Sequence, residues 1–113
     1  MGIDFSHGKA HWSYSGFMRF RARLAETLGY VDSLSHMYND GTYTCMKNEA
    51  IYPLIDHSDC DGNLTVEEMQ QIIPQLEDII NSWPADDGEK SRGKFLVESM
   101  KEAISENEPL EFM

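Results

Sequence analysis

Three stretches of the chain repeat apolar residues at the spacing of an α-helix, and this periodicity restricts the fold more than any other feature. The stretches cover residues 16–29, 66–80 and 89–106. In the first, the apolar side chains that share one helical face are Phe17, Phe20, Leu24 and Leu28. In the last they are Leu96, Met100, Ala103 and Ile104. The pattern predicts a mainly α-helical fold in which each helix buries one face.

Local signals indicate where these helices begin and end. Ser15 can cap the first helix, and Gly29 follows its last apolar residue. Thr65 and Glu68 form the capping-box pattern that precedes a helix over residues 66–80.

The prolines and the Asp-Gly pair predict less regular segments. We expect a helix over residues 46–55 whose last turn is weakened or kinked by Pro53, and a bend or break near Pro74. Residues 38–44 contain a tight-turn signal followed by β-prone residues, and residues 107–113 look extended. A short β pairing is therefore expected beside the helices.

Length and composition suit one small domain over residues 1–113. No run approaches the roughly 20 apolar residues of a membrane helix. The first residues also lack the basic start and apolar stretch of a secretory signal. We therefore expect a cytoplasmic protein without membrane attachment, in which Cys45 and Cys60 are reduced thiols.

The net charge of −11 is distributed unevenly. Residues 1–25 carry about +3 and residues 26–113 about −14. An acidic body argues against direct nucleic-acid binding, because that binding needs basic groups to displace counterions from phosphate. The charge suits a cation or a basic protein partner, and it equally suits a small protein that acidic groups keep in solution.

Residues 55–68, IDHSDCDGNLTVEE, lie between two expected helices and contain much of an EF-hand calcium loop. Calcium takes six to eight oxygen ligands, which the motif supplies around a sharp glycine turn and a closing bidentate glutamate. Asp59, Asp61 and Gly62 match the middle of the pattern, and Leu64 and Glu68 follow the glycine at the expected intervals. An EF-hand-like segment over about residues 46–80 is predicted.

The start of this loop differs from the ordinary motif. Five positions before Gly62 stands His57, and Asp56 lies one residue earlier. With one extra residue in the loop, Asp56 can serve as the first ligand, and the segment then resembles the enlarged loop of one osteonectin EF-hand. The predicted calcium ligands are Asp56, Asp59, Asp61, Asn63 through its backbone carbonyl, and Glu68.

Two questions about this loop stay open: whether a second loop pairs with it, and whether it binds a metal at all. Residues 36–47 carry Asp40 and Gly41 but place Tyr38 and Lys47 at ligand positions, so they can pair with the loop only as a structural pseudo-hand. The acidic segment can also be a solvated helix cap that binds no metal.

Nitrogen and sulfur ligands suggest zinc as another metal. His57 and Cys60 stand three residues apart, and His7 with His11 can complete a tetrahedral set. No catalytic constellation accompanies either set of ligands, because a nucleophile would need a base, an orienting group and an oxyanion pocket. We expect a protein that is not an enzyme.

Residues 11–23, HWSYSGFMRFRAR, interleave aromatic residues with arginines. Such residues are enriched at binding hot spots. Phe17 and Phe20 share a face with Leu24, however, which favours a place in the core. Trp12 can pack at the entry of the helix. The arginines have the acidic remainder of the chain as an intramolecular counter-surface.

The beginning MGIDFSHGKAHWSYSGFMRFR, the centre HSDCDGNLTVEE and the ending WPADD…EPLEF resemble a family of small uncharacterised bacterial and phage proteins. The resemblance implies a bacterial or phage setting and no particular activity. By analogy, a small acidic protein of this kind can act as an inhibitor that binds a basic partner without metal. Calcium binding and such an interaction are the two functions that the sequence favours.

Overall fold

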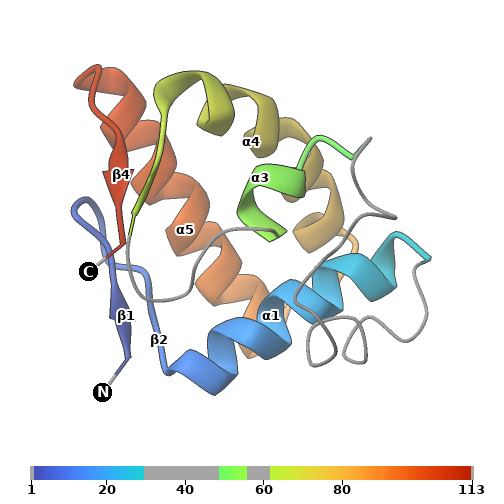
Figure 1. Cartoon of the computed structure of the whole chain (residues 1–113). Helices are drawn as coiled ribbons and strands as arrows, with labels where there is room; N and C mark the ends of the chain where they lie inside the picture. The colour runs from blue at the N-terminus through green and yellow to red at the C-terminus, as the bar shows by residue number, and fades with distance from the viewer. Residues whose placement is uncertain (1, 30–48, 56–61, 113) are drawn as a thin grey trace.

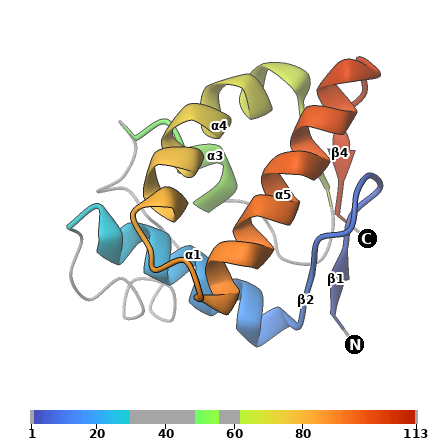
Figure 2. The same ribbon diagram turned by 180° about the vertical axis from the view of Figure 1, so that it is seen from behind.

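The structure is a computed structural model that describes residues 2–29, 49–55 and 62–112. In these residues the protein is mainly α-helical, as the periodicity predicts, and it also has short β pairing. Two long helices, α4 (Val66–Asn81) and α5 (Gly88–Ser105), lie side by side, and α1 (Tyr14–Thr27) crosses them at one end (Figures 1 and 2). The core lies between these three helices.

Helix α1 begins two residues earlier than the capping signal predicted. Ser13, with extended backbone angles, is the N-cap, and its hydroxyl accepts a hydrogen bond from the Gly16 N–H at 3.0 Å. Ser15 is inside the first turn, so its predicted capping role is wrong. The other end agrees with the sequence, because Gly29 takes a φ of +95° that favours glycine.

Helix α4 agrees closely with the prediction at its start. Thr65 Oγ1 accepts from the Glu68 N–H at 3.2 Å, and the Glu68 carboxylate accepts from the Thr65 N–H at 2.9 Å. Pro74 neither breaks nor ends the helix, which continues to Asn81. Because Pro74 is exposed, the carbonyl that loses its helical partner can be hydrated.

The helix predicted over residues 46–55 is much shorter in the described part. Helix α3 covers only Tyr52–Ile55, after a turn at residues 49–51. Pro53 was predicted to weaken the last turn of this helix, but it stands in the first turn. The first turn tolerates proline because its N–H groups have no intrahelical partner there.

In the described part of the chain, four two-residue strands form two antiparallel pairs. The chain's first strands, β1 (Ile3–Asp4) and β2 (His11–Trp12), pair with each other, and β3 (Asn63–Leu64) pairs with β4 (Leu110–Glu111). A bridge between Phe5 and Phe112 joins the two pairs. The start, the middle and the end of the chain therefore meet at one edge of the helical layer (Figure 1). The turn signal at residues 38–44 and the pseudo-hand of residues 36–47 lie outside the described residues.

Aromatic side chains fill the space between these strands and α1. Phe17 and Phe20 are fully buried, which confirms their predicted place in the core. The Phe5 ring packs edge-on against Trp12, Phe17 and Phe112 at centroid separations of 4.9–6.3 Å. The described residues include no helix with both the length and the apolar character needed to span a membrane.

Candidate metal sites

The structure describes two of the five predicted calcium ligands, Asn63 and Glu68. The other three, Asp56, Asp59 and Asp61, lie outside the described residues. What the structure does provide is the segment that leads into the loop and the whole segment that leaves it.

The exit segment begins at Gly62, whose φ of +91° lies in the region that favours glycine. The next two residues form β3, where exposed Asn63 faces Glu111 and fully buried Leu64 faces Leu110. The Gly62 carbonyl accepts from the Phe112 N–H at 2.9 Å, so β4 also holds the turn. This segment has a glycine turn, a short paired strand with an apolar anchor, and then a helix.

Glu68 lies in the first turn of α4, three residues after the N-cap Thr65. One carboxylate oxygen, Oε1, accepts from the Thr65 N–H. An ionised carboxylate offers about four lone-pair sites. The capping hydrogen bond therefore leaves Glu68 with acceptor capacity for a cation.

The entry segment is attached to α4 by glutamine side chains. Gln75 Oε1 accepts from the Ile51 N–H at 2.9 Å, and Gln71 Nε2 donates to the Ala50 carbonyl at 3.0 Å. Because Ile51 and Leu54 are fully buried, this entry segment has a definite place against α4. Both ends of the loop are therefore held on the same helix.

Of the four predicted zinc ligands, the structure describes His7 and His11. His57 and Cys60 lie outside the described residues. His11 Nδ1 lies 2.7 Å from Asp4 Oδ1 across the β1–β2 pair, and it belongs to no group of three potential ligands in the described part of the chain. The structure does not bring His7 and His11 into one such group.

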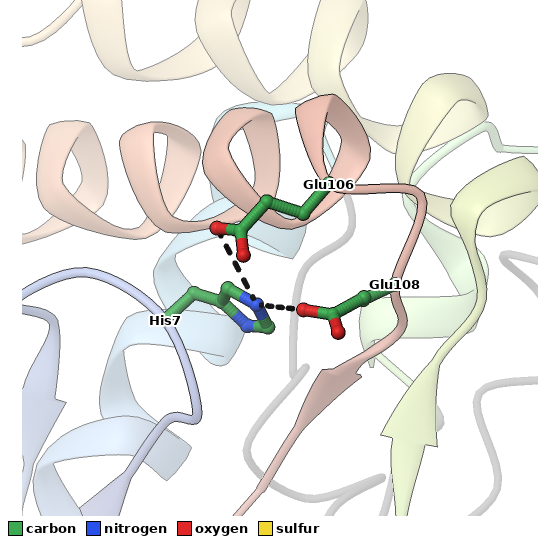
Figure 3. A group of neighbouring side chains, drawn as sticks. All are labelled: His7, Glu106 and Glu108. Atoms are coloured by element: carbon green, nitrogen blue, oxygen red, sulfur yellow. Dashed lines mark hydrogen bonds and ion pairs between the residues drawn. The ribbon is translucent and has the colours of Figure 1, made fainter.

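His7 instead approaches two glutamates from the other end of the sequence (Figure 3). Its Nε2 lies 2.9 Å from Glu108 Oε1 and 3.9 Å from Glu106 Oε2. His7 was among the predicted zinc ligands, but neither glutamate was. About 100 residues separate them from His7, and neither belongs to a recognisable ligand motif, so no local signal could have found this group.

The arginine-rich stretch makes internal contacts. Arg23 donates two hydrogen bonds to the Asp87 carboxylate, one of them from Nη1 to Oδ1 at 2.9 Å, and its guanidinium lies 3.9 Å from the centre of the Trp83 ring. The hydrogen bonds from Arg23 lower the pKa of Asp87 to about 2. Arg21 is buried beside the Phe17 ring, at 4.6 Å from its centre. The side chains of Arg21 and Arg23 are therefore held by contacts within the chain, as the intramolecular interpretation predicted.

Comparisons with family models, with curated proteins and with solved structures find no match to this chain. The resemblance to small bacterial and phage proteins and the local EF-hand resemblance both stay predictions.

Proposed function

We propose that this protein is a non-enzymatic calcium-binding protein whose ion is held by the loop between α3 and α4. The observation that carries the proposal is the exit segment, where a positive-φ Gly62, a buried Leu64 and a first-turn Glu68 follow one another as in an EF-hand. In such a loop the last residue closes the site with both carboxylate oxygens. Asp56, Asp59, Asp61 and the Asn63 carbonyl supply the other ligands.

The position of the paired strand supports this proposal. EF-hands usually occur in pairs, whereas here β3, which follows the loop, has β4 as its antiparallel partner. The C-terminal segment thereby gives the loop exit the support that a second loop would give. A single loop in this chain can consequently keep an ordered exit.

Calorimetric titration of metal-stripped protein with calcium tests the proposal. We expect one saturable site and a rise in melting temperature, because an ion that binds only the folded state stabilises it by mass action. Glu68→Gln should abolish the binding without loss of the cap, since glutamine also serves at this position of a capping box. Magnesium at the same ionic strength separates specific binding from general screening of the charge of −11.

Glu67→Gln is the matched control for Glu68→Gln. It removes the same charge from the same helical turn, but Glu67 is exposed and is not a predicted ligand. Retained binding in this variant, with loss in Glu68→Gln, would assign the effect to ligation. Equal loss in both variants, or no heat at millimolar calcium, would contradict the proposal.

The uneven charge favours one second candidate, an acidic surface for a basic protein partner. Four glutamates near the end of α5 and in the following segment are exposed: Glu102, Glu106, Glu108 and Glu111. Binding of this type weakens steeply with salt and does not require calcium. Salt-sensitive capture of a basic protein, equally strong in a calcium chelator, would favour this candidate over the first.

A further inference from the structure

The end of α5 and the turn between β1 and β2 together form a compact group of metal-ligating atoms. One nitrogen of His7 and one oxygen from each of Glu106 and Glu108 all lie within 4.8 Å of one another. Figure 3 shows the imidazole directed between the two carboxylates. The His7 side chain is only 12% exposed, whereas those of the glutamates are about half exposed.

His7 is held in place on both sides along the chain. Gly8 has a φ of +75° and sits so close to α5 that a Cβ there would lie 2.9 Å from the Cα of Ser99. On the other side, Ser6 exchanges hydrogen bonds with Glu111 of β4, through its N–H to the Glu111 carbonyl and from the Glu111 N–H to its hydroxyl. The imidazole therefore projects from a turn that is fixed against both α5 and β4.

The glutamates are positioned by the way in which α5 ends. The Asn107 N–H donates to the Ile104 carbonyl and the Glu108 N–H donates to the Ala103 carbonyl, each at 2.9 Å. These bonds form a Schellman motif with Asn107 at φ +55° in the left-handed position. The motif reverses the chain between Glu106 and Glu108, so both carboxylates reach the same imidazole.

The electrostatics at this end of α5 favour a cation. The C-terminus of a helix carries a partial negative charge, and two carboxylates beside it add to that charge. The last turn of α5 contains no basic residue. A divalent ion beside these two carboxylates would add two positive charges to this end of the helix.

We propose that His7 Nε2 and one carboxylate oxygen each from Glu106 and Glu108 bind a zinc ion, with water as the remaining ligand. In tetrahedral zinc sites the ligand atoms lie roughly 3.3 Å apart, for metal–ligand distances near 2.0–2.1 Å. The separations of 2.9 and 3.9 Å from Nε2 to the carboxylate oxygens fall on either side of that value. An imidazole nitrogen favours zinc over calcium.

The Ser6 hydroxyl supplies the second contact that a metal-binding histidine requires. His7 Nδ1 lies 2.7 Å from Ser6 Oγ. In the zinc-bound form the Nδ1–H group donates to that oxygen, so Nε2 presents its lone pair to the ion. Groups that orient a ligating imidazole in this manner raise its basicity and fix its tautomer.

This site shares His7 with the zinc set predicted from sequence, but its other ligands differ. Its test therefore uses the full chain in a His57→Ala, Cys60→Ser background, which removes the nitrogen and sulfur ligands of the loop. The metal-stripped protein is titrated with zinc by calorimetry. Nitrogen chemical shifts of the imidazoles report which ring atom binds.

We expect one zinc ion per chain in this background and a shift of the His7 Nε2 resonance. His7→Gln, and separately Glu106→Gln with Glu108→Gln, should each weaken zinc binding by about tenfold or more. His11→Gln, which removes an exposed histidine outside the group, should leave binding unchanged. Thermal unfolding without zinc checks that each variant is folded.

Three results would overturn the proposal. They are the absence of saturable zinc binding in the background protein, unchanged affinity in folded His7→Gln, and equal weakening by His11→Gln. The proposed zinc ligands His7, Glu106 and Glu108 all lie outside the 56–68 loop. The tests of the zinc site and of the proposed calcium site are therefore independent of each other.

Discussion

At the scale of single residues, Arg23 shows how one side chain joins several elements. Its guanidinium pairs with Asp87, the N-cap of α5, and stacks on Trp83 in the connection after α4. The Trp83 indole in turn donates to Thr27 Oγ1 of α1 at 3.0 Å. Lysine could not replace this arginine fully, since it lacks the planar fork that meets both carboxylate oxygens.

This contact makes stability depend on pH through Asp87. The carboxyl pKa is about 2 in the folded protein against an ordinary value of 3.8, so folding favours the ionised form. The resulting stabilisation is complete above about pH 4 and is lost as the pH falls through the folded value near 2. Asp87→Asn keeps a good N-cap but removes the charge.

We therefore expect Asp87→Asn to flatten the acid side of the stability profile, measured by urea unfolding across this pH range. Asp86→Asn, at the exposed neighbouring position, removes the same charge and serves as the control. If both variants kept the acid dependence of the wild type, the ion pair would not be its source.

At the scale of elements, α4 and α5 approach each other closely at Gly93. A Cβ added there would lie 2.9 Å from Ile80 Cγ2 and 3.3 Å from the Phe20 ring. The glycine thus permits contact of α5 with both α4 and α1. Gly88, the first residue of α5, has no atom within 4 Å of the same added carbon.

Gly93→Ala should destabilise the protein by up to about 2 kcal/mol, because overpacking a core costs roughly 1–3 kcal/mol and the helix preference of alanine over glycine offsets about 1 kcal/mol of that cost. Gly88→Ala makes the same chemical change in open space and should stay within about 0.5 kcal/mol of the wild type. Chemical denaturation measures both values. A stabilised Gly93→Ala would mean that Ile80 and Phe20 relax at little cost.

At the scale of the whole molecule, Phe112 connects the two ends of the chain. It is 5% exposed, its ring meets Phe5 and Phe17, and its N–H bonds to the Gly62 carbonyl before β3. The first strands, α1 and the proposed calcium loop therefore depend on one residue near the C-terminus.

Phe112→Ala should cost about 3–5 kcal/mol of the free energy of unfolding, as expected for a buried phenylalanine. Amide exchange should rise in β1, more than 100 residues away, together with β3. Phe95→Ala on α5 is the control, since Phe95 is 41% exposed. Faster exchange confined to β4 would show that the two ends are not coupled.

The sequence by itself determined the helical class, the ends of α4 and α5 to within one residue, and the exit segment of the loop. These features depend on neighbours three or four residues apart, on capping side chains and on a glycine with positive φ, all of which are local. The N-cap of α1 was misplaced because Ser13 and Ser15 carry the same side chain. Only the backbone conformation distinguishes them: Ser13 is extended and Ser15 is helical.

Only the tertiary structure decided which residues far apart in the sequence come into contact. The pairing of β3 with β4, the stacking of Arg23 on Trp83 and the approach of His7 to Glu106 and Glu108 all join distant parts of the chain. Strands of two residues carry almost no periodic signal, and a ligand group drawn from both ends of the chain carries no spacing. Such contacts arise when the helices pack and bring both termini to the same edge, so the proposed zinc site is a product of the packed fold.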